Sequence, residues 1–357
     1  MEGSEIGDKL RLLKELISGK RKILILTHLN PDPDALASAY GLRFLFKKWG
    51  VNSVIAYEGV IGRPENRAMV RRLRIPLCSV KTLEPRNFST IAVVDAQPLS
   101  TNVPLSSNLS PTIVIDHHPV AKKSSLKRVP FVDIRPNIGS TSTIVASYIL
   151  QAGLEPTPMV ATALFYGIKS DTRDLGPSAT SEDLKVATAL YPKISVKALS
   201  DIEHPRLPKE YFRILKEGIQ NSLYFPPGLL ISDLGTLGYV DMVSAIADLL
   251  LRAEGVKWVL SIGEWKGTVF FSIRCTNGKR MNAEKVAKRL IRGLTGAGAG
   301  GHESMAGGKV ESSNHKVFEV IQKLKLRFVK ELGSSWEKGI PFLGGGNGAE
   351  ERKVRNP

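Results

Sequence analysis

Acidic and imidazole side chains gather where several apolar segments end in the first half of the chain. Carboxylates that lie close together resist ionisation unless a multivalent cation sits among them, so a cluster of this kind predicts a metal site. Asp and His ligands without thiolates suit Mn²⁺, with Mg²⁺ or Co²⁺ as alternatives, and the number of ligands is sufficient for two ions. The residues are His28, Asp32 and Asp34 after one apolar run, Asp95 at the end of another, Asp116, His117 and His118 at the end of a third, and Asp171 close to the end of a helical pattern.

Taken one at a time, these residues have plainer interpretations. An Asp that follows a strand commonly caps a helix or closes a turn. Asp34, just ahead of a helical pattern, fits a helix cap, and Asp116 fits a strand-end turn as well as a residue that orients an imidazole. Unrelated turns are a poor explanation for four separate segments that end in such residues, and the joint pattern favours a metal site.

The segments that must position these side chains predict an α/β domain with a mostly parallel sheet flanked by helices. Helical patterns alternate with short runs that are apolar throughout, which is typical of parallel strands covered on both faces. Ligands of such sheets bind beyond the carboxyl ends of the strands, where the acidic and imidazole residues fall. Strands are predicted at 21–28, 51–57, 91–96 and 112–118, and helices at 10–17, 37–49 and over most of 140–192.

The second half of the chain predicts a smaller α/β domain, and we expect an active-site cleft between the two domains. Strands are expected at 228–234, 256–262 and 268–275, and helices at 240–255, 283–294 and 315–328. The predicted organisation is a catalytic, metal-binding domain over 1–195, a Pro-broken linker over 196–225, a substrate-binding domain over 226–335 and a flexible basic tail over 336–357.

Composition excludes several classes of protein. The chain of 357 residues has two cysteines, Cys78 and Cys275, which excludes a disulfide scaffold and a thiolate zinc site and indicates a reducing compartment. No apolar run approaches the ~20 residues that span a bilayer, and the N-terminus lacks the apolar segment of a secretory signal. We therefore expect a cytoplasmic protein without a membrane partner.

The formal net charge of +16 is a first indication of a polyanionic partner. Lys and Arg in such excess suit nucleic acid, because each neutralised phosphate releases counterions. The plainer interpretation is a solvated basic surface, and the presence of only four Gln favours a heat-adapted source. Charge alone favours neither interpretation over the other.

A glycine-rich segment in the second half is a candidate phosphate site. By itself the run at 296–301 indicates a flexible loop. Followed by His302, and preceded by a strand that carries Arg274, it indicates a phosphate pocket instead. Backbone N–H groups approach an anion closely at glycine, and Arg offers a bidentate fork.

Together these motifs resemble those of the DHH phosphoesterase family over nearly all of residues 20–335. The first domain carries four motifs in the family's order, as His28-x-Asn30-Pro31-Asp32-x-Asp34-Ala35, Asp95, Asp116-His117-His118 and Gly167-x-x-x-Asp171-Thr172. In the second domain, Ser272-x-Arg274, Gly300-Gly301-His302 and Ala306-Gly307 resemble the motifs of the DHH-associated C-terminal domain. Two residues depart from the family's pattern, Ala299 at the usual start of the glycine run and Met305 in place of Ala, and both predict an altered substrate fit.

The resemblance implies a role for each site residue. One metal would be held by His28, Asp32 and Asp95, and a second by Asp34, Asp95, His117 and Asp171, with Asp95 bridging. The catalytic residues would be His118, which faces the scissile phosphate as a hydrogen-bond donor, and Asp116, which orients an imidazole. Substrate would be bound by Ser272, Arg274, Gly300, Gly301 and His302. Two divalent ions in such a site activate water and stabilise both oxygens of an in-line displacement at phosphorus.

Within the family, the two-domain plan resembles the nanoRNase and oligoribonuclease branch. That resemblance implies an Mn-dependent phosphodiesterase that hydrolyses short single-stranded RNA or DNA to mononucleotides, and also acts on phosphoadenosine phosphate. The alternatives are a cyclic di-AMP phosphodiesterase and a RecJ-like single-strand exonuclease. The sequence leaves open the preferred substrate, the cleavage polarity and whether the protein forms a homodimer.

Two further functions found in the family fit this sequence less well. Inorganic pyrophosphatases share the first-domain motifs but have a different C-terminal domain, so Gly300-Gly301-His302 argues against them. Some relatives have lost metal ligands and serve as structural parts of replication complexes. Because every expected ligand is present here, an enzyme is favoured over a non-catalytic binding protein.

Overall fold

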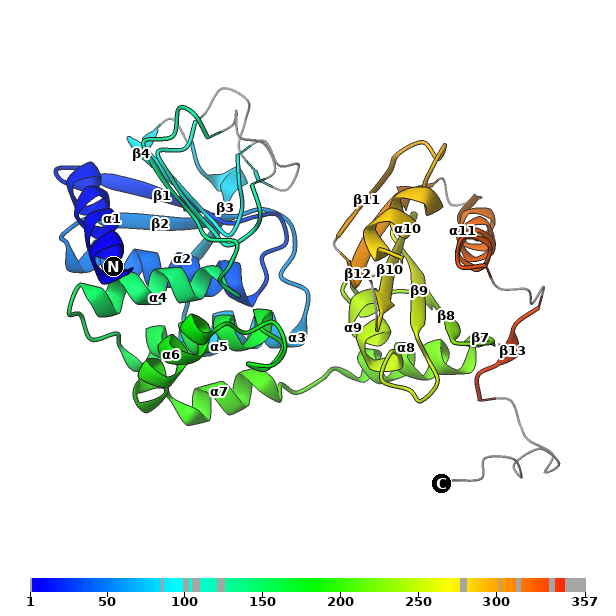
Figure 1. The fold of residues 1–357 in the computed structure, drawn as a ribbon. Helices are drawn as coiled ribbons and strands as arrows, with labels where there is room; N and C mark the ends of the chain where they lie inside the picture. Colours follow the sequence, from blue (N-terminus) through cyan, green and yellow to red (C-terminus); the bar gives the residue numbers. More distant parts are fainter. Residues whose placement is uncertain are drawn as a thin grey trace. The chain divides into compact units, whose positions relative to one another are not determined.

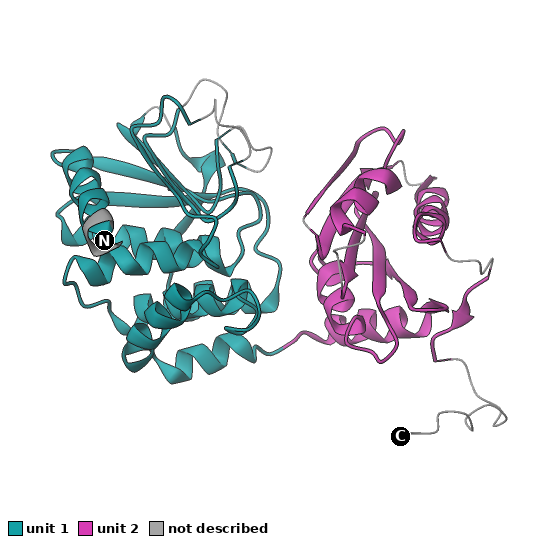
Figure 2. Cartoon of the chain, viewed as in Figure 1, with its two compact units in different colours: residues 1–206 teal, residues 207–357 magenta. Residues whose placement is uncertain are grey.

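The chain divides into two units, Met1–Arg206 and Leu207–Pro357, and each is described by itself (Figure 1, Figure 2). The cleft expected between the two domains stays a prediction. Within the part of the chain that the structure describes, no helix is both long and apolar enough to cross a membrane. The computed structural model describes residues 2–84, 87–98, 103–104, 110–120, 126–276, 281–301, 303–312, 316–333 and 338–343.

The first unit is built on a six-stranded sheet in which all neighbouring strands are parallel, as the sequence predicts. The strand order is β3-β2-β1-β4-β5-β6, so the order reverses between β1 and β4. In open parallel sheets this reversal opens a crevice at the carboxyl ends of the strands. The strands are β1 (Lys22–Leu26), β2 (Asn52–Tyr57), β3 (Leu77–Ser79), β4 (Thr90–Val94), β5 (Ile113–Asp116) and β6 (Phe131–Ile134).

Side chains along each strand alternate between the two faces of this sheet. On β1, Ile23 and Ile25 join a large core with the helices, whereas Leu24 and Leu26 join a smaller core. Irregular segments, with Phe88 among their residues, complete the smaller core. Both faces are therefore covered, one by helices and the other by irregular chain. The helices are α1 (Glu2–Ile17), α2 (Pro33–Lys48), α3 (Pro64–Leu73), α4 (Thr141–Gln151), α5 (Pro158–Asp171), α6 (Ser181–Leu190) and α7 (Val196–Glu203).

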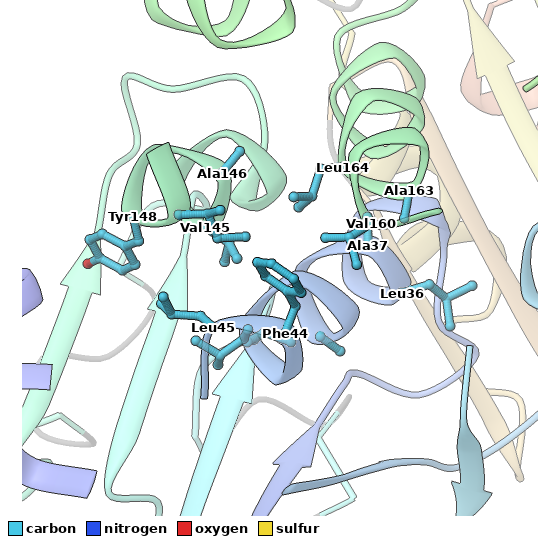
Figure 3. Packing of buried hydrophobic residues seen from close by; sticks show 14 of the residues in the cluster. Leu36, Ala37, Phe44, Leu45, Val145, Ala146, Tyr148, Val160, Ala163 and Leu164 are labelled. Atoms are coloured by element: carbon cyan, nitrogen blue, oxygen red, sulfur yellow. The ribbon is translucent and has the colours of Figure 1, made fainter. Parts of the chain in front are cut away.

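Helices α2, α4 and α5 pack closely against one another on the helix-covered face of the sheet. Figure 3 shows Phe44 and Leu45 of α2 among side chains of the other two helices. The helices approach closely because α2 has a glycine at the crossing: a Cβ at Gly41 would lie 2.9 Å from the side chains of Leu164 and Val145. This packing fixes the ends of α4 and α5, from which functional side chains extend.

The second unit contains a mixed sheet in the order β11-β12-β10-β9-β8-β7-β13, which the sequence predicts only in part. Strands β8 and β9 pair in parallel and the other pairs are antiparallel. Ile231 of β8 packs with α10 and α11 on one face, and Leu230 packs with α8 and α9 on the other. The elements are α8 (Lys209–Gln220), β7 (Leu223–Phe225), β8 (Leu229–Thr236), α9 (Met242–Leu250), β9 (Trp258–Trp265), β10 (Thr268–Cys275), α10 (Ala283–Leu290), β11 (Ala297–Gly301), β12 (Met305–Glu311), α11 (Val317–Glu331) and β13 (Ile340–Pro341).

The segments predicted as linker and tail contain regular structure. The chain passes between the units at Arg206–Leu207, inside the predicted linker, but α7 belongs to the first unit while α8 and β7 belong to the second. Within the predicted tail, Ile340 and Pro341 pair with β7 and are strand. Proline is tolerated there because an edge strand leaves one side of the backbone unpaired. Residues 344–357 of the predicted tail lie outside the described residues.

Substituting Gly167→Ala should destabilise the first unit. A Cβ at Gly167 of α5 would lie 2.3 Å from Ser142 Oγ and 2.8 Å from Ala37 Cβ, so α5 must shift away from α2 and α4. We expect a loss of ~1–3 kcal/mol in the free energy of unfolding, measured by urea denaturation. The matched control is Gly7→Ala in α1, where nothing lies within 4 Å of the added Cβ and alanine should stabilise by up to ~1 kcal/mol. Equal effects of the two substitutions would contradict the packing argument.

Candidate metal centre

The predicted ligands His28 and Asp95 follow two neighbouring strands at the point where the strand order reverses. β1 ends at Leu26 and β4 ends at Val94, so both ligands lie at the carboxyl edge of the sheet. His28 Nε2 lies 3.5 Å from Asp95 Oδ2 and 3.6 Å from Asp32 Oδ1. The parallel topology has thus brought together side chains from two segments that are distant in the sequence.

The Asp95 carboxylate is buried and positioned by its surroundings. Its φ of +57° lies in the left-handed region, which residues other than glycine rarely adopt. Its backbone N–H donates to the Ile115 carbonyl at 2.9 Å, and the Thr141 hydroxyl donates to Asp95 Oδ1 at 2.9 Å. An unfavourable backbone conformation that is held by such contacts is characteristic of functional sites.

The loop after β1 places two carboxylates by different means. Asp32 is the N-cap of α2, and its Oδ1 accepts the Ala35 N–H at 3.0 Å. Asp34 lies in the first turn of α2, is buried, and accepts the backbone N–H groups of Thr141 and Ser142, each at 2.7 Å. These are free donors at the N-terminus of α4, where a carboxylate is favoured. The helix cap is therefore Asp32, and the alternative that Asp34 acts only as a cap is wrong.

His117 is surrounded by carboxylates from three segments. Its Nε2 lies 3.1 Å from Asp171 Oδ2, 3.6 Å from Asp95 Oδ1 and 4.0 Å from Asp34 Oδ2. Its Nδ1 lies 3.2 Å from the Ile138 carbonyl, to which it can only donate, so Nε2 is the nitrogen left for another partner. In the described structure Nε2 is buried and has no hydrogen-bond partner of good geometry.

Asp116, His118 and Gln97 form a hydrogen-bonded group beside these ligands. Asp116 Oδ1 lies 2.8 Å from His118 Nδ1 and also accepts the His118 backbone N–H at 3.2 Å. Gln97 Nε2 donates to Asp116 Oδ2 at 2.7 Å and to the carbonyls of His118 and Pro119. The His118 side chain is 56% exposed, whereas Asp116 is buried. The contact that sequence reasoning expected from Asp116, orientation of an imidazole, is present in the structure.

Burial and mutual repulsion make the carboxyls at the centre resist ionisation. Burial, together with the negative charges of Asp95 and Asp171, raises the pKa of Asp34 well above its ordinary value. Burial also raises the pKa of Asp95, although His28 opposes the shift. Burial disfavours a charged His117, yet the surrounding carboxylates outweigh it and raise the pKa of His117 to about 10. A bound cation would replace that proton and stabilise the carboxylates.

The residues present fit divalent cations. In the described part of the chain, three sets of ligand atoms lie within 4.8 Å of one another. A buried imidazole nitrogen that faces three carboxylates, carboxyls that resist ionisation and the absence of thiolate from the sets all suit an ion of the Mn²⁺ or Mg²⁺ type. The sets are His28 with Asp32 and Asp95, Asp34 with His117 and Asp171, and Asp95 with His117 and His118.

All six predicted metal ligands are thus brought together, and two contributors to the centre were not predicted. The N-terminus of α4, with N-cap Ser140 and donors Thr141 and Ser142, binds two of the carboxylates. The run of Ser and Thr at 140–143 signals a helix start, but no local pattern indicates which carboxylate that start will meet. Gln97, two residues after Asp95, carried no sequence signal at all.

The second unit places the predicted substrate-binding residues on three neighbouring strands. Ser272 of β10 lies opposite Gly307 of β12, which lies opposite Gly300 of β11. Arg274 lies opposite Met305, so the departure from the family pattern at Met305 directly adjoins the predicted phosphate-binding arginine. The cross-strand register therefore gathers these residues at one end of the sheet.

Arg274 is buried and its guanidinium is already engaged within the unit. Nε donates to Asp248 of α9, while Nη1 donates to Ser272 Oγ at 2.7 Å and to the Ile273 carbonyl at 3.0 Å. These bonds use three of the five N–H donors of the guanidinium. Ser272 therefore has a definite contact, orienting the arginine, and a phosphate at Arg274 would use the other donors or displace Asp248.

The glycine-rich segment forms an edge strand, although its sequence suggested a loop. Gly300 and Gly301 end β11, and a Cβ at Gly301, where φ is +150°, would lie 2.3 Å from the Met305 carbonyl oxygen. Among the described residues, nothing lies within 4 Å of a Cβ added at Gly300, so the space beside this residue is empty of their atoms. An edge strand also presents backbone N–H groups on its outer side. His302 lies outside the described residues, so its role stays a prediction.

Models of two protein domains match the chain. The DHH family, N-terminal domain, matches residues 22–168, and the DHHA1 domain matches residues 229–330. The first match begins with β1 and ends within α5, and the second begins with β8 and ends within α11. The two matches therefore fall in the two units of the structure.

Several known proteins resemble the chain. An uncharacterized protein of Methanocaldococcus jannaschii is 33% identical over 91% of this chain and 69% of its own length. The bifunctional oligoribonuclease and PAP phosphatase NrnA of Thermus thermophilus is 27% identical over 88% of this chain and 94% of its own. A probable manganese-dependent inorganic pyrophosphatase of Deinococcus radiodurans is 29% identical, but the match spans 51% of this chain and 56% of that protein.

The same fold occurs in a solved structure. An exopolyphosphatase-related protein from Bacteroides fragilis matches with a TM-score of 0.72 at 16% identity, covering 91% of this chain and 97% of that one. The likeness agrees with the α/β architecture of both units.

Asp95→Asn should abolish stabilisation by Mn²⁺ without damaging the fold. Asn keeps the size of the side chain and tolerates a positive φ, but it removes the carboxylate that two of the ligand sets share. Wild-type protein should melt at a higher temperature in excess Mn²⁺ than in EDTA, because a ligand of the folded state stabilises it. The variant should show no such shift, and its melting temperature in EDTA should not fall, because a buried negative charge has been removed.

The matched control is Asp8→Asn, whose side chain is 71% exposed in α1. This variant should respond to Mn²⁺ as the wild type does. A shift of equal size in the Asp95→Asn variant would contradict the assignment of Asp95 as a metal ligand.

Thr141→Val should weaken Mn²⁺ binding by about 10–100-fold, as loss of a hydrogen bond to a metal ligand usually does. Valine keeps the shape of the side chain but removes the hydroxyl that donates to Asp95 Oδ1. Thr141→Ser retains the hydroxyl and should bind Mn²⁺ nearly as the wild type does. Calorimetric titration checks both variants, and equal affinities for valine and serine would refute a positioning role for the hydroxyl.

Proposed function

The chain is a DHH family phosphoesterase with a C-terminal DHHA1 domain, and on this premise we propose that it hydrolyses short oligonucleotides to mononucleotides in a manganese-dependent reaction. The observation that carries the proposal is the match to the Thermus thermophilus oligoribonuclease, which extends over 88% of this chain and therefore into both units. A relative that shared the catalytic half alone would leave the substrate class open. This one also shares the unit predicted to bind the substrate.

The name of the same relative supports a second activity, as a PAP phosphatase. Both reactions hydrolyse a phosphoester of a small nucleotide, so one centre can serve both. An inorganic pyrophosphatase has weaker support, because the match to such a protein spans little more than half of either chain.

Two divalent ions, Mn²⁺ in this proposal, would be held by the residues of the centre. Such ions, when bound, lower the pKa of water and stabilise the charge that develops on a phosphate. Other residues of the chain position the ligands: the N-terminus of α4 holds Asp34, Thr141 holds Asp95, and the Ile138 carbonyl fixes the tautomer of His117. One ion would be bound by His28, Asp32 and Asp95, and the other by Asp34, Asp95, His117 and Asp171.

His118 is the proposed hydrogen-bond donor to the phosphate. Its hydrogen bond to Asp116 raises the pKa of His118 above the ordinary value, which favours the imidazolium. With Nδ1 held by Asp116, Nε2 of the exposed ring is left to donate to a phosphate oxygen or to the leaving group. Gln97 acts one step further away, because it holds Asp116 in place.

In the second unit, we assign phosphate binding to the end of the sheet that carries Arg274. The guanidinium donors that remain after Asp248, Ser272 and the Ile273 carbonyl are satisfied can form charge-assisted hydrogen bonds with a terminal phosphate. The outer N–H groups of β11 near Gly300 are neutral donors of the same kind.

A panel of substrates tests the proposed function. With Mn²⁺, the protein should hydrolyse 5′-phosphorylated dinucleotides and phosphoadenosine phosphate faster than cyclic dinucleotides, pyrophosphate or long single strands. Rates should fall steeply once the oligonucleotide exceeds a few units, because a terminal phosphate must reach its binding residues. Equal rates on long single strands would favour a RecJ-like exonuclease, and a preference for pyrophosphate would contradict the proposal.

The Asp95→Asn protein, purified in the same way, is the control for contaminating nucleases and should be inactive on every substrate of the panel. If that preparation were as active as the wild type, the metal centre would no longer be supported as the catalytic site.

A further inference from the structure

A basic groove runs along α3 in the first unit, apart from the metal centre. A hollow of about 750 Å³ lies at the C-terminal end of α3, and one of about 300 Å³ adjoins it, because both have Arg71, Pro205 and Arg206 in their walls. We call the two together the α3 groove. Its charged lining is Arg67, Arg71, Arg72, Arg74, Arg206 and a single carboxylate, Asp201.

Two of these arginines lie on one face of α3. Arg67 and Arg71 are four residues apart in the helix, and Arg74 follows as its C-cap residue. Like charges at such spacings destabilise a helix. The helix dipole stabilises basic residues in the last turn, but it does not stabilise Arg67, which lies near the N-terminus. The Arg67–Arg71 pair therefore does not contribute to the stability of the isolated helix.

Arg74 adds a second unfavourable feature. It ends α3 with a φ of +52°, a position where glycine is the usual residue because a side chain is strained there. The chain nevertheless has an arginine at this point, with its side chain in the wall of the α3 groove. Across the groove, Asp201 lies 3.3 Å from Arg72 Nε, so the one carboxylate is engaged by one arginine and the groove stays strongly positive.

The α3 groove is linked to the metal centre through α3 itself. At the N-terminal end of the helix, Asn66 Nδ2 donates to the Pro31 carbonyl at 3.4 Å, and Pro31 directly precedes the predicted ligand Asp32. The helix is 10 residues long, which corresponds to ~15 Å. The helix thus runs from the ligand loop to the C-terminal end of the groove, over a length suited to a few nucleotides.

We propose that the α3 groove binds the phosphodiester backbone of a single-stranded oligonucleotide. Arginine forks bind phosphate oxygens bidentately and read no sequence, which suits a backbone site. Binding to a membrane of anionic lipid requires apolar side chains that insert beside the charged ones, whereas this site is a hollow lined mainly by arginine. That the bound strand is the substrate, continuing from the bond at the metal centre, rests on the proposed function.

Binding without turnover tests the α3 groove directly. The probe is a fluorescently labelled five-nucleotide single strand, titrated in EDTA at several salt concentrations and followed by anisotropy. In the Arg71→Gln/Arg74→Gln variant we expect affinity to fall about tenfold and the slope of log K against log salt to fall by about 1.4, at ~0.7 per lost phosphate contact. Arg206→Gln, on the opposite wall, should weaken binding in the same direction and keeps the test valid if the double variant folds poorly.

The matched control is Lys20→Gln/Arg21→Gln, which removes two charges from an exposed loop of the same unit. If this control weakens binding as much as the groove variant does, the effect is net charge and the proposal falls. It also falls if the groove variant binds the strand normally, or if it loses binding only to phosphatidylserine vesicles.

The test separates this inference from the proposed function. Loss of binding in the groove variants supports the α3 groove even if the wild type hydrolyses no oligonucleotide, which would overturn only the proposed function. Normal binding by the groove variants, together with hydrolysis of dinucleotides by the wild type, overturns the groove and leaves the function in place.

Discussion

Repulsion among buried carboxylates at the carboxyl edge of the first sheet is the constraint on which the rest of the structure depends. Asp34 and Asp95 are buried side by side, and burial and repulsion raise the pKa of both. The chain holds them with neutral donors, the first N–H groups of α4 and the Thr141 hydroxyl. A lysine or arginine in their place would satisfy the negative charge and exclude a metal ion. Neutral donors fix the carboxylates and leave their charge for a divalent cation.

This arrangement couples the chemistry of the centre to the packing of the helices. The donors for Asp34 exist only where α4 begins, and α4 is placed by its contacts with α2 and α5. Gly167 lets α5 approach α4 closely enough to bring Asp171 beside His117. A methyl group at that glycine would move a ligand as well as loosen the core, because interiors of this density transmit small displacements.

Charge is distributed in the molecule in a way that the net value of +16 conceals. The metal centre of the first unit is acidic. The arginines of the α3 groove lie along α3, and the N-terminal end of that helix contacts the ligand loop. An oligonucleotide substrate would need both kinds of site: metal ions at the phosphodiester bond that is cleaved, and arginines along the rest of its backbone. In the second unit, Arg274 is held between Ser272 and Asp248, so its positive charge is already oriented before any ligand binds.

The sequence by itself determined the parallel α/β class of the first unit and the set of candidate ligands. Both follow from local features: strands that are apolar throughout belong in a parallel sheet, and the carboxyl ends of parallel strands meet at one edge, so residues such as His28 and Asp95 must converge. Only the tertiary structure decided that Asp32 is the helix cap, that Asp34 binds α4, that the glycines at 300–301 are strand, and that the arginines at 67–74 face Arg206 across a groove. The binding of Asp34 to α4 and the groove that includes Arg206 depend on contacts between segments far apart in the chain, which hydrophobic periodicity does not encode. The cap at Asp32 and the pairing of the glycines with residues 306–307 are contacts between near neighbours, but local preferences alone do not distinguish them from the alternatives of a cap at Asp34 and a loop.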